Sequence, residues 1–344
     1  MREKRKGFRT PKRTGPGRLR CYDIRVRVAL IGYGGVARAF VRLLDQKRSV
    51  FPFRVVGVHT RGGTAVNPSG MRPDAELGPA AASTDEFLDR VPSDVVIEVT
   101  ELNPSTGEPA LSHIRAAFRR HRHVITANKG PLAHAYAALR DEARTAGVEF
   151  RYEATVMDGA PVFNTVRNNL PGVQVLGFTG VLNSTTKIVV EAMREGRSFE
   201  EGVIQARELG IAEADASYDT DGWDAAAKTA VLANVLMDAQ VTPLDVDRRG
   251  IGKLTPERVR SLGGDRKTVC LVSRAKRTSA GIRLRVRAEV LDDTDLLASV
   301  HGTSNLILFH TDLMGTVGTV SISPGVEQTA YGVFSDLIDI AKSV

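Results

Sequence analysis

The chain has 344 residues, of which 42% are hydrophobic and 25% charged, an ordinary composition for a globular protein of about two domains. No apolar run approaches the ~18 residues of a membrane span, which excludes an integral membrane protein. The two cysteines, Cys21 and Cys270, lie far apart in the sequence. This argues against a disulfide scaffold or a zinc ribbon and favours the reducing cytoplasm.

The net charge of +7 is concentrated at the N-terminus. Residues 1–20 hold nine Lys or Arg and one Glu, a charge of +8, which leaves −1 for the other 324 residues. This segment has almost no large apolar residue, so we expect residues 1–23 to be a disordered basic tail. Three interpretations remain: a translation start without function, a weak polyanion contact, or a transit peptide. Prolines and glycines argue against the amphipathic helix of a transit peptide.

Strands and helices alternate over residues 24–150. The first strand, Arg25–Ile31, is followed by a glycine turn and a helix with one apolar face. Residues of that face recur at i, i+3, i+4 and i+7: Ala37, Phe40, Val41 and Leu44. Further strands are expected at 53–58, 94–99, 123–126 and 148–154, with a helix at 111–118. The alternation predicts an α/β fold, with a parallel, doubly wound sheet of Rossmann type.

Residues 151–323 follow a different pattern, typical of an α+β domain. Residues 184–237 are expected to be mostly helical. Ser198 and Glu201 match a capping box, and Gly210 stands where that helix would end. Antiparallel strands are expected at 267–275, 281–291, 304–311 and 316–323. The last amphipathic segment is Tyr331–Ala341.

The turn after the first strand has the pattern G-x-G-x-x-A. Gly32 permits a tight turn, Gly34 lets the backbone approach a pyrophosphate, and Ala37 allows close packing of helix on strand. Glycines also make simple turns, but this one joins the first strand and helix of a βαβ series, which favours dinucleotide binding. The cofactor-binding candidates here are Gly32, Tyr33, Gly34, Gly35, Val36 and Ala37.

The end of the second strand suggests which dinucleotide is bound. An NAD site usually has an acidic residue about 20 positions after the glycines, but no Asp or Glu occurs between Asp45 and Asp74. Arg61 follows the second strand instead, and an arginine there can accept a 2′-phosphate. We therefore predict that NADP(H) is preferred over NAD(H). The alternative is that Arg61 points into solvent at a loop tip.

Residues suited to catalysis occur in four short stretches. Lys129 follows a predicted parallel strand, so it would lie beside a nicotinamide. Two further stretches are residues 152–161 and 180–186. The fourth, residues 210–228, contains Asp224 and Lys228, which share one helix face. Asp224 and Lys228 could equally be a solvated ion pair. Acidic residues in this stretch could form a solvated turn or a calcium-like loop, although the spacing lacks the EF-hand order: Glu213, Asp215, Asp219 and Asp221.

With these stretches in place, the chain resembles the homoserine dehydrogenases from about residue 25 to its C-terminus. Seven blocks of the family occur in order: Gly32–Ala37, Glu98–Thr100, Thr126–Lys129, Glu153–Pro161, Asn183–Thr186, Gly210–Asp215 with Gly222–Lys228, and Thr329–Gly332. The resemblance implies NAD(P)-dependent, reversible oxidation of L-homoserine to L-aspartate 4-semialdehyde, in threonine, methionine and isoleucine biosynthesis.

The resemblance also assigns roles to single residues. Lys129, Lys228 and Asp224 would be catalytic, and which lysine is the principal acid/base stays open. Glu213, Asp219 and Lys228 would bind the substrate. Thr100, Lys129 and Thr329 would join the glycine turn and Arg61 at the cofactor. Such a lysine can stabilise an alkoxide and carry its proton if its pKa is lowered.

A monovalent cation and a homodimer are further implications of the resemblance. Na⁺ or K⁺ would bind largely through backbone carbonyls of Glu153, Val156, Asp158 and Ala160, although this stretch could be a simple hinge turn. The dimer would form through residues 151–323, the substrate-binding and catalytic domain. Residues 324–344 would return to the nucleotide-binding domain. Because the chain ends soon after this block, we expect a monofunctional enzyme without a regulatory ACT domain.

The chain departs from the family pattern at several positions. Ser184 stands where the family usually has glycine, Lys187 where asparagine is common, and Ala216 where proline is common. Residues 321–328 replace a glycine-rich loop that normally lies by the cofactor. We therefore expect an active but divergent member.

Two rival functions fit the sequence less well. Aspartate-semialdehyde dehydrogenase needs a nucleophilic cysteine, but Cys21 precedes the first strand and Cys270 is expected in a core. A non-catalytic nucleotide sensor could use the basic tail on nucleic acid. The intact Lys129, Asp224 and Lys228 argue against it, so we expect neither a nucleic-acid nor a membrane partner.

Overall fold

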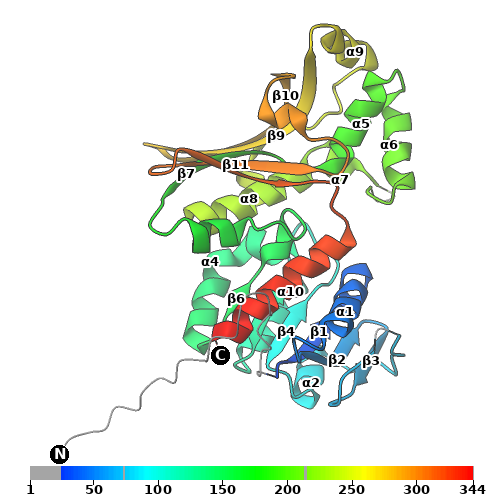
Figure 1. Ribbon diagram of the computed structural model, residues 1–344, viewed down its shortest axis with the longest axis vertical. Coiled ribbons are helices and arrows are strands. Elements are labelled where there is room, and N and C mark those ends of the chain that lie inside the picture. Colours follow the sequence, from blue (N-terminus) through cyan, green and yellow to red (C-terminus); the bar gives the residue numbers. More distant parts are fainter. Residues whose placement is uncertain (1–24, 73, 213–214, 344) are drawn as a thin grey trace, which may run out of the picture.

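The computed structural model describes residues 25–72, 74–212 and 215–343. The predicted disordered tail and the candidate Glu213 lie outside these residues. Figure 1 shows two parts stacked along the long axis, a parallel sheet below and an antiparallel sheet above. No helix within the described ranges has the length and apolar character needed to cross a membrane.

The lower part is a six-stranded sheet in the order β3-β2-β1-β4-β5-β6. Its pairs are parallel except for the β2–β3 hairpin. The strands are β1 (Arg27–Ile31), β2 (Arg54–Thr60), β3 (Gly63–Val66), β4 (Val95–Glu98), β5 (His123–Thr126) and β6 (Phe150–Arg151). The helices are α1 (Gly35–Lys47), α2 (Thr84–Arg90), α3 (Ala110–Phe118) and α4 (Lys129–Ala146).

Alternate residues of β1 enter two different cores, which is why helices cover both faces of this sheet. Val28 and Leu30 pack in the core that includes α1. Ala29 and Ile31 pack in the core that includes α2, α3 and α4. The predicted doubly wound α/β arrangement is confirmed.

The strand predicted at residues 148–154 is shorter than expected. β6 ends at Arg151, and a 3₁₀ turn, η1 (Glu153–Thr155), follows. The chain turns here because Glu153 is held from two sides. Its amide donates to Asp336 at 2.8 Å, and its carboxylate accepts from the amides of Phe163 and Asn164, each at 2.8 Å.

The upper part is a second six-stranded sheet in the order β12-β11-β7-β9-β10-β8. Its strands are β7 (Val175–Val181), β8 (Asp247–Arg248), β9 (Lys267–Thr278), β10 (Gly281–Asp292), β11 (Asn305–Thr311) and β12 (Thr316–Ser321). The four predicted strands are present as β9 to β12. Sequence reasoning missed β7, which lies between β11 and β9. Gly177 allows this close approach, since a Cβ there would lie 2.4 Å from the Ala275 carbonyl oxygen.

The helices of the upper part are α5 (Ser184–Arg194), α6 (Phe199–Glu208), α7 (Ser217–Thr220), α8 (Trp223–Met237) and α9 (Pro256–Gly264). Shorter helical turns are Thr165–Asn169, Pro243–Asp245 and Leu296–Ser299. The predicted capping box of α6 is formed by Ser198 and Glu201. Gly210 follows α6 with φ +69°, the left-handed conformation that glycine favours.

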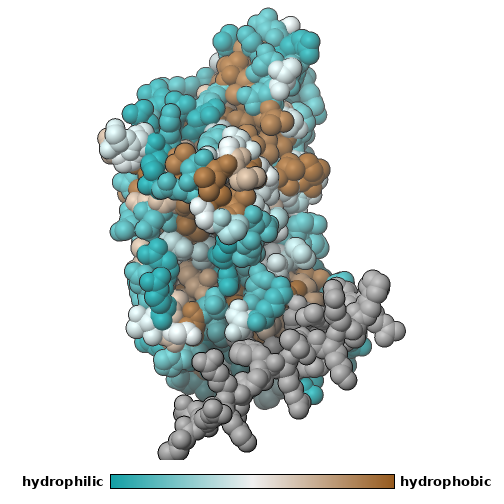
Figure 2. Space-filling model, turned by 60° about the vertical axis from the view of Figure 1, so that its left-hand side comes forward, coloured by the Kyte–Doolittle hydropathy of each residue, from teal (hydrophilic) through white to brown (hydrophobic). Residues whose placement is uncertain are grey.

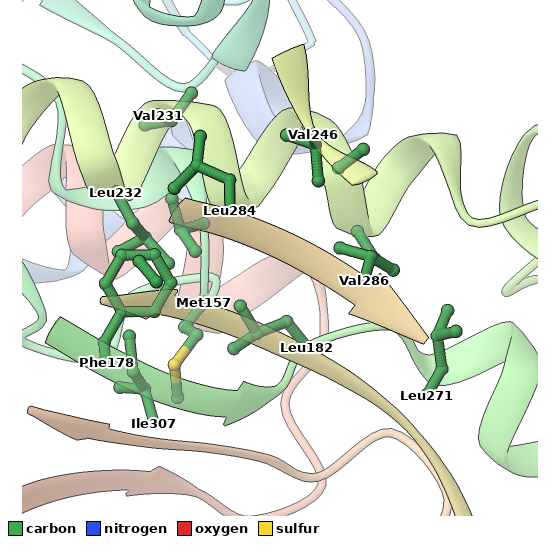
Figure 3. Packing of buried hydrophobic residues seen from close by; sticks show 14 of the residues in the cluster. Met157, Phe178, Leu182, Val231, Leu232, Val246, Leu271, Leu284, Val286 and Ile307 are labelled. Carbon is green, nitrogen blue, oxygen red and sulfur yellow. The ribbon is translucent and has the colours of Figure 1, made fainter. Parts of the chain in front are cut away.

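The helix α8 lies between the second sheet and α4 and is buried along most of its length. Figure 3 shows Val231 and Leu232 of α8 beside Leu284 of β10. On the α4 side, Asn234 donates a hydrogen bond of 3.0 Å to the Leu132 carbonyl. Because both sides of α8 are covered, its polar residues near the N-terminus are held inside the molecule.

The last helix, α10 (Val326–Ser343), crosses back from the upper part to α1 of the lower part (Figure 1). Phe334 packs edge-on against Phe51 with ring centroids 5.2 Å apart. Gly159 and Gly332 permit the close crossing with the turn after η1. A Cβ on Gly332 would lie 2.9 Å from the Gly159 Cα. The C-terminal helix α10 thus connects the parallel sheet of the lower part to the turn after η1, where the chain enters the upper part.

Candidate active site

The glycine turn lies at the carboxyl edge of the parallel sheet. Gly32 has φ +99°, and a Cβ there would lie 2.6 Å from the Val99 carbonyl oxygen, so this position requires glycine. No atom of the described chain lies within 4 Å of the corresponding point on Gly34, which leaves room for a phosphate beside it. α1 begins at Gly35, so its first amides face this space.

A cleft of about 660 Å³ opens beside this turn. It is lined by the carboxyl ends of β1, β2 and β4 and by the start of α3: Ile31, Gly32, Tyr33, Gly34, His59, Thr60, Arg61, Val99, Thr100, Glu101, Leu102, Asn103, Glu108, Pro109 and His113. The Arg61 side chain is 95% exposed at the rim, and its guanidinium lies 3.4 Å from the Glu101 carboxylate. Arg61 therefore lines the cleft, and its side chain also points into solvent.

The buried carboxylate of Glu98 organises the end of β4. It accepts hydrogen bonds from the Thr100 amide at 3.1 Å and from the Thr126 hydroxyl at 3.0 Å. The Thr100 hydroxyl also donates to it. Thr100 is thereby fixed in the wall of the cleft.

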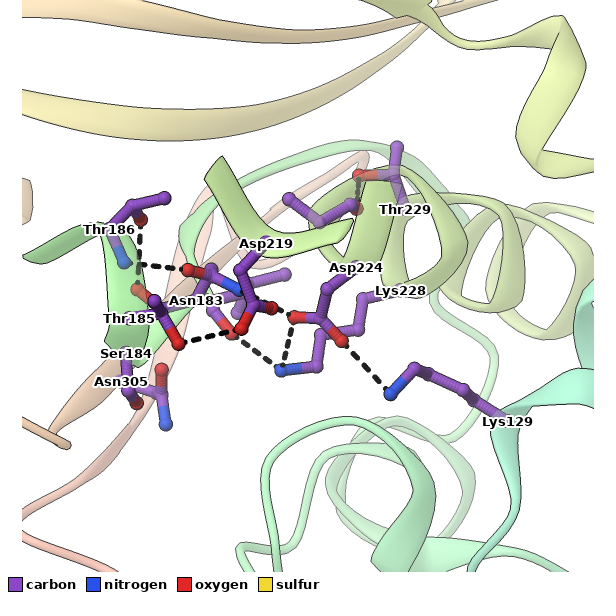
Figure 4. Close-up of polar contacts among 12 residues, drawn as sticks. Lys129, Asn183, Ser184, Thr185, Thr186, Asp219, Asp224, Lys228, Thr229 and Asn305 are labelled. Atoms are coloured by element: carbon purple, nitrogen blue, oxygen red, sulfur yellow. Dashed lines mark hydrogen bonds and ion pairs between the residues drawn. The ribbon is translucent and has the colours of Figure 1, made fainter. Parts of the chain in front are cut away.

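Deeper in the junction between the two parts, one carboxylate holds two lysines (Figure 4). Lys129, the first residue of α4, lies 2.9 Å from Asp224 Oδ1. Lys228 lies 3.1 Å from Asp224 Oδ2 and donates a 2.7 Å hydrogen bond to the Leu182 carbonyl. We call Lys129, Asp224 and Lys228 the ion triad. It connects α4 of the lower part to α8 of the upper part.

Asn183, the residue before α5, connects this ion triad to a second carboxylate. Its side-chain amide donates to Asp219 at 2.7 Å and to Asp224 at 2.9 Å. Its side-chain oxygen caps α5 by accepting from the Thr186 amide. Thr185 donates to the other oxygen of Asp219 at 2.7 Å. The start of α5 thus fixes the separation of the two acids.

The two acids respond differently to being buried. Burial alone would raise the pKa of Asp224, but the charges of Lys129 and Lys228 outweigh it and hold the pKa well below its usual range. Burial and the charge of Asp224 raise the pKa of Asp219, against its hydrogen bonds from Thr185 and Asn183. Asp224 is therefore a permanent anion, whereas Asp219 gains a proton more readily.

Comparison with known proteins identifies the family to which this chain belongs. The model for homoserine dehydrogenase matches residues 161–338, and the model for the homoserine dehydrogenase NAD binding domain matches residues 32–153. The chain belongs to the homoserine dehydrogenase family. It therefore has a pyridine-nucleotide-binding domain and is an NAD(P)-dependent oxidoreductase.

Individual members of this family cover almost the whole chain. Homoserine dehydrogenase of Methanocaldococcus jannaschii is 34% identical over 92% of this chain and 98% of its own length. NAD(+)-dependent homoserine dehydrogenase of Pseudomonas canavaninivorans is 35% identical over 92% and 96%. The crystal structure of homoserine dehydrogenase from Thermoplasma acidophilum superposes with a TM-score of 0.81 at 27% identity, covering 93% of this chain and 100% of that one.

Most of the expected site residues of this chain lie in two groups. Lys129, Asp219, Asp224 and Lys228 are brought together at the junction. The glycine turn, Arg61 and Thr100 line or adjoin the cleft, and Glu213 lies outside the described residues. The Thr329 hydroxyl donates to Asp158 at 3.2 Å, and its place at the cofactor remains a prediction.

The four residues expected at a cation lie in the turn beside α10. Burial raises the pKa of Asp158, and this residue has a left-handed φ of +56°. The Glu153 carboxylate is occupied by amides of residues 162–164. Val156 is buried, and the Ala160 carbonyl accepts from the Val162 amide at 2.8 Å. No cluster of three or more metal-ligating side chains occurs in the ranges that the structure describes.

Three residues at the site were given no role by sequence reasoning: Glu98, Asn183 and Thr185. Asn183 before a helix is a recognisable cap signal, because its side chain can accept from the third helical amide. Its second function, donating to two acids 36 and 41 positions away, has no local sequence signal.

Proposed function

We propose that this protein catalyses the reversible oxidation of L-homoserine to L-aspartate 4-semialdehyde at the junction of its two domains. One observation carries the proposal: Asp224 holds Lys129 and Lys228 at the domain junction, and Asn128, the residue before Lys129, donates to the Thr100 and Glu101 carbonyls in the wall of the dinucleotide cleft. This supplies amines where an alcohol oxygen must lose or gain a proton. Such a reaction serves amino-acid biosynthesis in the cytoplasm.

The substrate has an ammonium and a carboxylate as well as the reacting alcohol. Asp219, with Glu213 by family resemblance, suits the ammonium. Lys228 is fixed by two acceptors, Asp224 and the Leu182 carbonyl. A charged amine has three N–H groups, so one remains to reach the substrate oxygen.

The chemical step needs a hydride acceptor and a proton acceptor. A nicotinamide dinucleotide held at the glycine turn, Gly32–Ala37, would supply the hydride acceptor. In this direction Lys228 or Lys129 takes the hydroxyl proton as the C=O bond forms, and in reduction the charged amine returns it. Asp224 fixes the amines in place and stabilises their charged forms.

The first test is reduction of NADP⁺ or NAD⁺ by L-homoserine, followed at 340 nm. Lys228→Ala removes an amine at the reacting oxygen and should lower kcat at least ~100-fold, the usual contribution of a positioned acid or base. Asp221→Asn, an exposed neighbour on the same segment, should leave kcat within about twofold because surface changes are near neutral.

Cofactor binding by the Lys228→Ala protein is measured separately by nicotinamide fluorescence. This shows that the variant is folded. No turnover by the wild-type protein in either direction, with cofactor binding intact, would contradict the proposed reaction and favour a nucleotide sensor.

NADP(H) is the proposed preferred cofactor, on the strength of Arg61 at the rim of the cleft. Arg61→Ala should raise KM for NADP⁺ about tenfold or more, the value of a charge-assisted contact, and leave KM for NAD⁺ unchanged. Glu101→Gln removes the carboxylate that competes for Arg61, so it should lower KM for NADP⁺. Arg90→Ala, an exposed arginine of α2, is the control. Equal effects of Arg61→Ala on both cofactors would contradict this preference.

A bound Na⁺ or K⁺ is proposed at the carbonyls of Glu153, Val156, Asp158 and Ala160. Carbonyl oxygens suit such hard cations, and the Glu153 carboxylate is already occupied. Activity should rise with added KCl or NaCl relative to choline chloride of equal ionic strength. Equal rates in all three salts would count against a functional cation.

A homodimer is proposed through the second sheet. Apolar side chains are exposed along β12 and the turn before it: Leu313, Met314, Val320 and Ile322. Figure 2 shows hydrophobic residues gathered on the upper half of one face. Sedimentation should give twice the mass of one chain. Val320 is 52% exposed in one chain, and Val320→Asp should shift the sedimenting species from the dimer toward the monomer. A wild-type monomer at micromolar concentration would exclude the dimer.

A further inference from the structure

Lys187 of α5 is a buried lysine outside the ion triad. Its side chain is only 4% exposed. Its amine donates to the Asn183 carbonyl at 3.1 Å and to the Asn305 side-chain oxygen at 3.4 Å. Both acceptors are neutral, and within the described ranges no carboxylate lies within 4 Å of the amine. A charged ammonium is costly in such surroundings.

The contacts of Lys187 lead directly to the ion triad. Asn183, whose carbonyl it holds, donates through its side chain to Asp219 and Asp224. The preceding carbonyl, that of Leu182, anchors Lys228. Lys187 therefore supports the two-residue backbone segment on which the position of the reacting amine depends.

The charged groups around Lys187 come from several elements. Lys228 and Asp224 face it from α8, Glu191 lies one turn ahead on α5, and Cys270 faces it from β9. The charge of Lys187 also acts to lower the pKa of Asp158, in the turn beside α10. Glu191 is engaged by the Gly302 amide at 3.1 Å and by His301. Burial first, and the charge of Lys228 second, lower the pKa of Lys187 to about 7.

We propose that Lys187 is a proton-sensitive positioning residue: as a neutral amine it braces the Leu182–Asn183 backbone, and as an ammonium it inhibits alcohol oxidation by adding a like charge beside Lys228. The inhibition follows because a positive charge there opposes the gain of a further proton by either amine of the ion triad. This inference rests on the proposed function for its effect on rate but not for its effect on stability.

The kinetic test compares pH profiles of wild type and Lys187→Met, which keeps the length and apolar stem of the side chain. In wild type, kcat for L-homoserine oxidation should fall about tenfold per pH unit below an inflection near pH 7. Lys187→Met should lose that inflection and retain KM for the cofactor. Lys253→Met, an exposed lysine, is the control. The same inflection in Lys187→Met would overturn the proposal.

The second test does not require activity. Between pH 7 and 10 the unfolded chain binds one proton at Lys187 that the folded chain does not, so wild-type stability should rise with pH relative to Lys187→Met. The ratio of their unfolding constants, from urea denaturation at pH 7, 8 and 9, should change about fivefold between pH 7 and 8 and about tenfold between pH 8 and 9. A pH-independent ratio would show that Lys187 stays charged and would overturn the proposal. A changing ratio in an inactive protein would contradict only the proposed reaction.

Discussion

A single buried anion, Asp224, determines how the two domains meet. A carboxylate removed from water is strongly destabilising unless opposite charge and hydrogen bonds replace the solvent. Here the groups that replace water around Asp224 come from both sides of the junction. Lys129 belongs to the nucleotide-binding domain, and Lys228 and Asn183 belong to the second domain. Separating the domains would take Lys129 away from Asp224 and leave that buried carboxylate with only one of its two lysines. The ion triad that spans the junction therefore also brings the amines of Lys129 and Lys228 to one carboxylate.

The burial of Asp224 is itself a consequence of where α8 lies. An ordinary surface helix has one apolar stripe, whereas α8 is covered by the second sheet on one side and by α4 on the other. Its first turn points at the domain junction, so Asp224 and Lys228, four residues apart, enter the interior together. Small residues such as Ala225, Ala226 and Ala227 allow this close packing. A helix packed on one side only would leave the same pair in solvent.

Local signals in the sequence were sufficient for much of the fold. The glycine turn, the strand–helix alternation and the Ser198 capping box are short-range patterns, and each corresponds to an observed element. The pairing of Lys129 with Asp224 spans 95 positions and the pairing of Asn183 with Asp219 spans 36, so neither has a periodic signature. β6 ended early for a similar reason: distant groups on α10 and after η1 hold Glu153. The parts of the site that escaped prediction are contacts made only by the tertiary fold.

Three buried ionisable groups, Asp224, Asp336 and Lys187, differ in whether a group of opposite charge lies in contact with them. Asp224 has two lysines, so its pKa moves away from neutrality and its charge is permanent. Asp336 and Lys187 lack that compensation. Burial, with the charge of Glu153, raises the pKa of Asp336 to about 8, and burial lowers that of Lys187 to about 7. Their effects on stability are opposite in sign. The Asp336 contribution falls as pH rises from about 4 to 8, and the Lys187 contribution rises as pH rises from about 7 to 10. Among these three described residues, the lysines hold Asp224 ionised, whereas burial moves the pKa of Asp336 and that of Lys187 toward neutrality.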